Sequence, residues 1–161
     1  MVAIGHGVPD RLLHVEMEDA VTNAVSYPLR VTHTSSGTVA TSFGVGQEFE
    51  LENASNTNRI AGTFEFQYTD ATNATEDASY KLRLIKAGTL TDALTVDSIG
   101  NGTFAGVVKT AGYTVATLPT GVIGYRAYVT DALTPTFGAT VVGGGAVTIP
   151  VFFDGANWIV G

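Results

Sequence analysis

The chain has 161 residues, of which 14% are charged and 19 are glycine, and its formal net charge is −7 at pH 7. So few charges exclude a charge-rich disordered chain and argue against a helical bundle, whose surface needs many Glu, Lys and Arg side chains. The eight Lys and Arg residues are scattered, so the chain lacks the clustered basic surface of a nucleic-acid-binding protein, and no apolar run is long enough for membrane insertion.

The first 26 residues allow two interpretations. Residues 10–25 can form a short helix with Asp10 or Asp19 as its N-cap. Alternatively, residues 12–17 form a strand, because their side chains divide into two alternating sets. We expect the strand, followed by a loop or a single helical turn over residues 19–23.

Residues 43–85 show the clearest strand pattern in the chain. Apolar and polar residues alternate over 43–53, 60–69 and 80–85, which is the period of a half-buried strand. The segments between them are rich in Asn, Asp, Ser and Thr, which favour turns. Three strands with such short connections predict an antiparallel meander.

Charged side chains within this meander lead to two further predictions. We expect Glu65 to face Lys81 or Arg83 across the sheet, a pairing that contributes about 0.2–1 kcal/mol. Glu48, Glu50 and Glu52 are expected on one face of their strand, and the register should keep Glu65 from lying opposite them. These three carboxylates can hold a cation, but calcium sites prefer turns with mixed ligands, so a solvated strand face is the favoured interpretation.

Glycines become frequent after residue 94, which indicates short strands and tight turns. Strands are predicted over 93–96, 103–109, 124–130, 146–153 and 157–160. Asp154-Gly155 is a hairpin signal, although Ala156 and Asn157 can lengthen the loop. The sequence thus predicts an all-β protein, an antiparallel β-sandwich or meander, with a body module over 1–109 and a C-terminal module over 110–161.

No pattern of catalytic residues is present. His6, His14 and His33 are not at metal-ligand spacing, and the chain lacks phosphate-binding and hydrolase motifs. Without cysteine it has neither a disulfide nor a thiolate metal site. We therefore expect a protein that is not an enzyme and has no cofactor, no metal site and no catalytic residue.

Aromatic residues gather near the C-terminus, at Tyr125, Tyr128, Phe152, Phe153 and Trp158. Packing in a core or a subunit interface is the favoured interpretation. The alternative is a surface on which sugars stack. Its candidate glycan-binding residues are Trp158, Tyr125, Tyr128 and Asp154, since sugars stack on aromatic faces and donate hydrogen bonds to carboxylates.

Three segments resemble bacteriophage tail-fibre and appendage proteins. Residues 2–5 (VAIG) and 9–15 (PDRLLHV) resemble the "VGIGT…P…LHV" motif, with His6 in place of the usual threonine. Residues 94–102 (LTVDSIGNG) are similar to the "LRVTSTGNVGI" element, which closes one β module and leads into the next. The third segment, residues 113–158, resembles a recurrent fibre ending and contains the stretches LP at 118–119, GYRAYVTD at 124–131, PTF at 135–137, GGG at 143–145 and DGANW at 154–158.

The resemblance implies a protein exposed on the virion surface and without catalytic residues. It also implies a homotrimer, with chains side by side or intertwined about a threefold axis. Phage fibres are commonly several times longer and carry a separate anchoring region, which is not recognisable here. We therefore expect a non-enzymatic short fibre, spike or capsid-decorating protein that contacts other virion proteins of the capsid or tail. The alternative is a receptor-recognition module of a tail fibre that binds a host-surface glycan.

Overall fold

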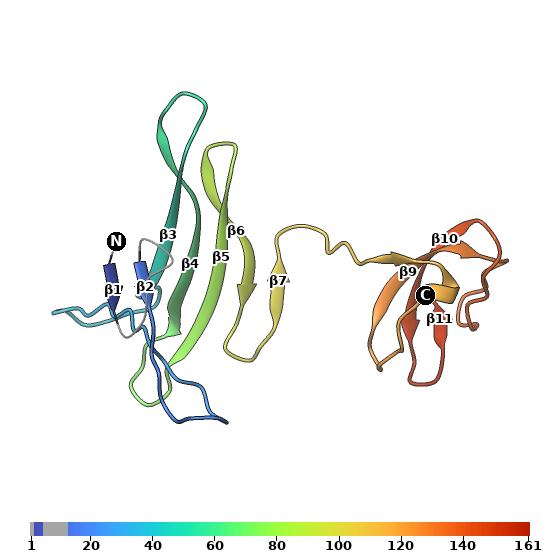
Figure 1. Cartoon of the computed structure of the whole chain (residues 1–161), viewed down its shortest axis with the longest axis horizontal. Helices are drawn as coiled ribbons and strands as arrows, with labels where there is room; N and C mark the ends of the chain where they lie inside the picture. The colour runs from blue at the N-terminus through green and yellow to red at the C-terminus, as the bar shows by residue number, and fades with distance from the viewer. Residues whose placement is uncertain (1, 5–12) are drawn as a thin grey trace. The chain divides into compact units, whose positions relative to one another are not determined.

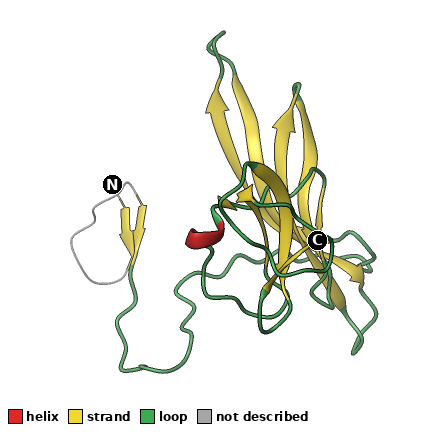
Figure 2. Cartoon of the chain, turned by 90° about the vertical axis from the view of Figure 1, so that its right-hand side faces the viewer, coloured by secondary structure: helices red, strands yellow, loops and turns green. Residues whose placement is uncertain are grey.

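The computed structural model describes residues 2–4 and 13–161. Strands make up its regular structure, and the short 3-10 turn η1 (Val115–Thr117) is the only helical segment among these residues (Figure 2). The all-β class predicted from the sequence is confirmed. The chain divides into two compact units, Met1–Gly106 and Val107–Gly161, close to the expected division between residues 109 and 110.

The N-terminal part contains a small parallel pair, β1 (Val2–Ile4) and β2 (Leu13–Val15). β2 lies within the strand expected over 12–17, so the strand interpretation is confirmed for these three residues. The remaining motif residues, and Asp10 with them, fall in 5–12, outside the described residues. Residues 16–43 contain neither helix nor strand, and the Asp19 carboxylate accepts hydrogen bonds from the Val21 amide (2.8 Å) and the Ser26 hydroxyl (2.7 Å).

The first unit contains a five-stranded antiparallel meander (Figure 1). Its strands are β3 (Gly44–Glu52), β4 (Asn58–Asp70), β5 (Asp77–Lys86), β6 (Thr89–Val96) and β7 (Gly102–Phe104). Each strand pairs with the next one along the chain. The meander predicted for the first three strands is confirmed, and it continues through two more.

Two strand boundaries of this sheet differ from the sequence-based expectation by four residues or more. β6 begins at Thr89 rather than at residue 93, because Ala87 and Gly88 both have positive φ (48° and 82°) and make a two-residue hairpin turn. β7 ends at Phe104 rather than at residue 109. Its partner β6 has a bulge next to this point, where Ala93 is an extra residue in the pairing, so the regular ladder stops there.

The loop between β3 and β4 is closed by its own hydrogen bonds. The side-chain oxygen Oδ1 of Asn53 accepts from the amides of Ser55 (2.9 Å) and Thr57 (3.1 Å). The Asn53 amide donates to the Thr57 carbonyl (3.0 Å). This polar turn is exposed and self-contained, so it sets the hairpin without help from the rest of the sheet.

The second unit is a four-stranded sheet in the order β11-β10-β9-β8. The strands are β8 (Gly112–Tyr113), β9 (Arg126–Ala132), β10 (Val147–Phe153) and β11 (Trp158–Val160). β8 runs parallel to β9, and the other pairs are antiparallel. The Asp154 hairpin expected between the last two strands is confirmed, in its longer form, with the Asp154 amide donating to the Asn157 carbonyl (3.1 Å).

A compact apolar core lies on one face of this second sheet. Val129 is fully buried at its centre, and the other buried members are Ala127, Ala132, Val141, Val151 and Val160. Val141 comes from a segment that hydrogen-bonds along β11, through its amide to the Trp158 carbonyl (2.9 Å). Val115 and Leu118, which precede β9, also pack on the core. Connecting segments therefore cover the sheet.

Candidate functional site

Cross-strand register gives the five-stranded sheet two chemically different faces. Residues directly opposite each other in neighbouring strands share a face. The apolar face comprises Val45, Phe49, Phe64, Phe66, Tyr68, Tyr80, Leu82, Leu84, Leu94, Val96 and Phe104. The polar face comprises Glu48, Thr63, Glu65, Gln67, Ser79, Lys81, Arg83, Asp92, Thr95 and Thr103.

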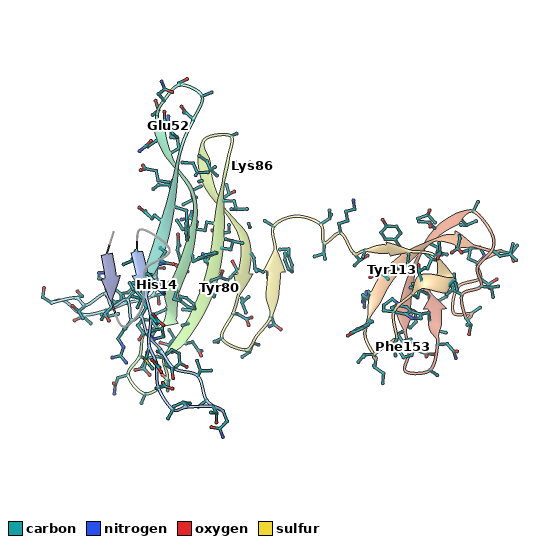
Figure 3. The ribbon with its side chains drawn as sticks, viewed as in Figure 1. His14, Glu52, Tyr80, Lys86, Tyr113 and Phe153 are labelled. Carbon is teal, nitrogen blue, oxygen red and sulfur yellow. The ribbon has the colours of Figure 1, made fainter. Side chains whose placement is uncertain are left out.

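Aromatic rings form a continuous ladder across the apolar face. Phe49 meets Phe64 edge-on, with centroids 5.3 Å apart. Tyr80, labelled in Figure 3, lies 5.2 Å from Phe66 and 6.3 Å from Phe64. These separations are typical of favourable aromatic pairs. The rings join β3, β4 and β5 side to side, but they do not form a second layer.

Within the first unit, most of the apolar face is open to solvent. Phe66 is 57% exposed, Phe104 55% and Leu84 49%. Among the described residues, every apolar side chain buried in a core belongs to the second unit. The buried polar side chains of the first unit, Thr63 and Ser79, both lie on the polar face. The first unit therefore has a sheet but no core of its own.

The segment before β3 covers only one end of the apolar face. Leu29 and Val31 line a hollow of about 270 Å³ together with Val45 and Phe66. The segment is anchored next to them by His33, whose ring stacks on Phe43 at 4.2 Å and whose Nδ1 lies 2.7 Å from the Gly44 carbonyl oxygen. Because a carbonyl only accepts, Nδ1 is the donor in this hydrogen bond. Phe66 stays more than half exposed even with this segment in place.

The polar face carries a network of ion pairs. Asp92 contacts Lys81 (3.1 Å) and Arg83 (2.9 Å), and Arg83 also contacts Glu65 (3.5 Å). The predicted partners of Glu65 are confirmed, since it lies opposite Lys81 in the register and pairs with Arg83. The hydrogen bond from Lys81, with the charges of Lys81 and Arg83, holds the pKa of the Asp92 carboxyl below its usual value.

The register shift beside the glutamates of β3 lies in the partner strand. Phe49 pairs with Gly62 and Glu50 with Ile60, so Ala61 of β4 is the extra residue, while β3 itself alternates without interruption. Glu48, Glu50 and Glu52 therefore share one face of their strand, as predicted. Glu65 lies opposite Gly46, so the expected avoidance of the glutamates is confirmed. Glu50 accepts a hydrogen bond from the Asn58 amide group (3.1 Å).

The described residues hold no group of three or more His, Cys, Asp or Glu side chains placed to bind a metal ion. His14 lies in β2, 4.0 Å from the Glu16 carboxylate, and His33 contacts the sheet as described above. His6 is outside the described residues. No helix in the described part of the chain is long and apolar enough to span a membrane.

The four candidate glycan-binding residues do not share a surface. Trp158 packs on the core side of its sheet, where its ring meets Phe153 at 5.6 Å and its Nε1 donates to the Pro119 carbonyl (3.2 Å). Tyr128 lies on the opposite face, because it neighbours the core residue Val129 in β9 and pairs with Pro150. Its ring fills the space beside Gly112, where a Cβ atom would come within 2.6 Å of it.

Tyr125 and Asp154 lie in turns. Tyr125 is 48% exposed and closes a turn through its amide to the Val122 carbonyl (3.0 Å). Asp154 Oδ1 accepts from the amides of Ala156 and Asn157, each at 2.8 Å. The Asn157 amide, followed by the Ala156 amide, lowers the pKa of the Asp154 carboxyl. Asp154 is thus engaged in shaping its own hairpin.

Comparison with known proteins returns no match. No family model, no curated protein and no solved structure is similar to this chain. Among the features described above, the exposed apolar face of the first unit is the strongest indication of function. Sequence reasoning identified the alternation that creates this face, but it did not identify the face as the functional surface.

Proposed function

We propose that this protein is a non-enzymatic structural protein of a phage particle, exposed on the virion surface as a homotrimeric short fibre, spike or capsid-decorating protein. The observation that carries the proposal is the first unit's open apolar face, with Phe66 and Phe104 more than half exposed. A sheet needs its apolar side covered. Large exposed apolar patches mark sites of association. An exposed apolar face is therefore expected in a protein that associates with other copies or other proteins.

The resemblance of three segments to phage fibre and appendage proteins supplies the kind of assembly. It supports a trimer and a place on the virion, with capsid or tail proteins as neighbours. The glycan-binding alternative has less support, because Trp158 and Tyr128 lie on opposite faces of one sheet and Trp158 packs on the core. The trimeric structural role is therefore the preferred proposal.

Molar mass in solution tests the assembly. Light scattering on the purified chain at micromolar concentration should give about three times 16.7 kDa. The mass should not change as salt is raised, because salt screens charge interactions rather than apolar contacts. A monomer at all concentrations would overturn the proposal.

Location on the particle needs a separate experiment. Antibodies raised against the purified chain should label intact particles of the phage or prophage that carries the gene, as seen by electron microscopy. Particles in which a capsid or tail antibody binds but this antibody does not would contradict the virion assignment, whatever the mass in solution.

A further inference from the structure

We propose that the apolar face of the five-stranded sheet is the surface on which copies of this chain pack against one another. Each copy then supplies the layer that the first unit lacks. This inference rests on the proposed function, because it names the partner and the surface of the same assembly. The contact between copies then lies on one side of one sheet and is centred on Phe66, Leu84 and Phe104.

The area of the apolar face shows why the sheet needs a covering layer. Strands lie about 4.8 Å apart and rise about 3.3 Å per residue, so a five-stranded sheet of this length presents on the order of 700 Å² per face. This area exceeds the largest apolar patch that a typical monomeric protein exposes, about 300–600 Å². The ring ladder from Phe49 through Phe64 to Tyr80 makes the patch continuous. A second surface must lie on it for the sheet to have a dry core.

The chemistry of the face favours a second copy of this chain as its occupant. The chain carries a net charge of −7, so two copies repel unless they meet where charges are absent. None of the apolar-face residues named above carries a charge at neutral pH, Lys86 stands at the hairpin end of that side beyond Leu84, and the ion pairs around Asp92 lie on the other side of the sheet. Uncharged apolar surfaces are complementary to themselves, which suits the symmetric contacts of homo-oligomers.

The other exposed parts of the sheet fit copies of the chain less well. The outer edge of β3 carries Glu48, Glu50 and Glu52, all exposed. Pairing two such edges would place six carboxylates side by side, which is a known device against edge-to-edge association. The opposite edge is β7, with only three residues. The polar face already pairs its charges internally.

The experiment uses the natural absence of cysteine. Two single variants are prepared, Phe104→Cys on the apolar face and Thr103→Cys on the polar face. The two residues are neighbours in β7, and both are exposed within the first unit. The rate at which each thiol reacts with an aromatic disulfide reagent is measured on the assembled protein, and again after dilution to the monomer or after denaturation.

The expected result is selective protection. In the assembly, the thiol of the Phe104→Cys variant should react at least about tenfold more slowly than the thiol of the Thr103→Cys variant. This difference in rate should vanish in the unfolded chain. Equal rates, or protection of the Thr103→Cys thiol alone, in a protein that still has the mass of a trimer would overturn the assignment of the face and leave the proposed function standing. A monomeric parent protein would instead overturn both.

A second pair of variants tests the same face by disruption. Phe66→Lys places a charge on the apolar face, and Gln67→Lys places the same charge on the neighbouring residue of β4, which lies on the polar face opposite Ser79. Light scattering should give a monomer for Phe66→Lys and the parent mass for Gln67→Lys. Trp158 fluorescence should stay unchanged in both, since the sole tryptophan reports on the second unit. A Phe66→Lys protein with the parent mass and parent fluorescence would contradict the inference.

Discussion

The two units use the same kind of sheet but bury it in different ways. In the second unit, the segments that carry Val115 and Val141 lie against one face and close a core around Val129. In the first unit, which is nearly twice as long, the segment with Leu29 and Val31 reaches only one end of the apolar face. The difference teaches that alternation decides which residues share a face, while the connections decide whether that face is covered within the chain.

The largest loss of stability is expected from a charge placed in the core of the second unit, which would remove the covered sheet from this comparison. Val129→Asp buries an unpaired carboxylate, which costs about 3–5 kcal/mol. A unit of this length has a total stability of only about 3–8 kcal/mol, so it should unfold. Trp158 fluorescence should shift to that of an exposed indole, while the first unit still associates. Thr148→Asp, at an exposed residue of β10, is the control and should change stability by less than about 0.5 kcal/mol.

Protein concentration should separate the two units without any mutation. A unit stabilised by its partner copies gains stability with concentration by mass action, whereas a unit with its own core does not. Amides of β4 and β5 should therefore exchange hydrogen more slowly as concentration rises, and amides of β9 and β10 should exchange at a constant rate. Hydrogen exchange read by mass spectrometry measures both in one sample. Identical behaviour of the two sets of amides would remove the distinction between the units.

A smaller effect is expected on the polar face. Arg83 joins Glu65 to Asp92, so Arg83→Met should lower the free energy of unfolding by about 1 kcal/mol, the upper end for partly exposed ion pairs. Lys86→Met, at the exposed last residue of β5 and without an ion pair among those described, is the control. It should change stability by less than about 0.5 kcal/mol. Chemical denaturation with and without added salt provides the measurement.

The smallest effect concerns pH and a hairpin in each unit. Amide donors lower the pKa of Asp154 in the second unit and of Asp97 in the first below the usual 3.8. A lowered pKa in the folded state means that the stabilisation is complete above the usual carboxyl pKa and is lost as the pH falls through the folded value. Asp154→Asn should flatten the acid side of the stability profile measured by Trp158 fluorescence, and Asp97→Asn should leave that profile unchanged.

Local signals explain the parts of the fold that were predictable. Alternation located β3, β4 and β5, and the pairing of Glu65 with Lys81 and Arg83 followed from the order of the strands. Asp154-Gly155 located the last hairpin. The Ala87-Gly88 turn was missed, since alanine rarely adopts the positive φ of 48° that it has there.

The remaining features depend on register and on contacts between distant segments. The extra residue Ala61 in β4 shifts the register of that strand against β3 by one residue, so Ile60 lies opposite Glu50 although Gly62 lies opposite Phe49. The same parity places Trp158 and Tyr128 on opposite faces, although both lie in predicted strands. Whether an apolar face is covered depends on where a loop of nearly thirty residues settles, and no local pattern encodes that.

The self-contained turn after β3 has a practical consequence. Asn53 closes the loop through hydrogen bonds with Ser55, Asn56 and Thr57, and none of these bonds involves the apolar face or the ion pairs. A foreign peptide inserted between Asn56 and Thr57 would interrupt only this small set of hydrogen bonds, and loops of this kind tolerate insertion well. Each assembled particle would then display the peptide once per copy of the chain, which makes the hairpin a natural site for presenting epitopes or affinity tags.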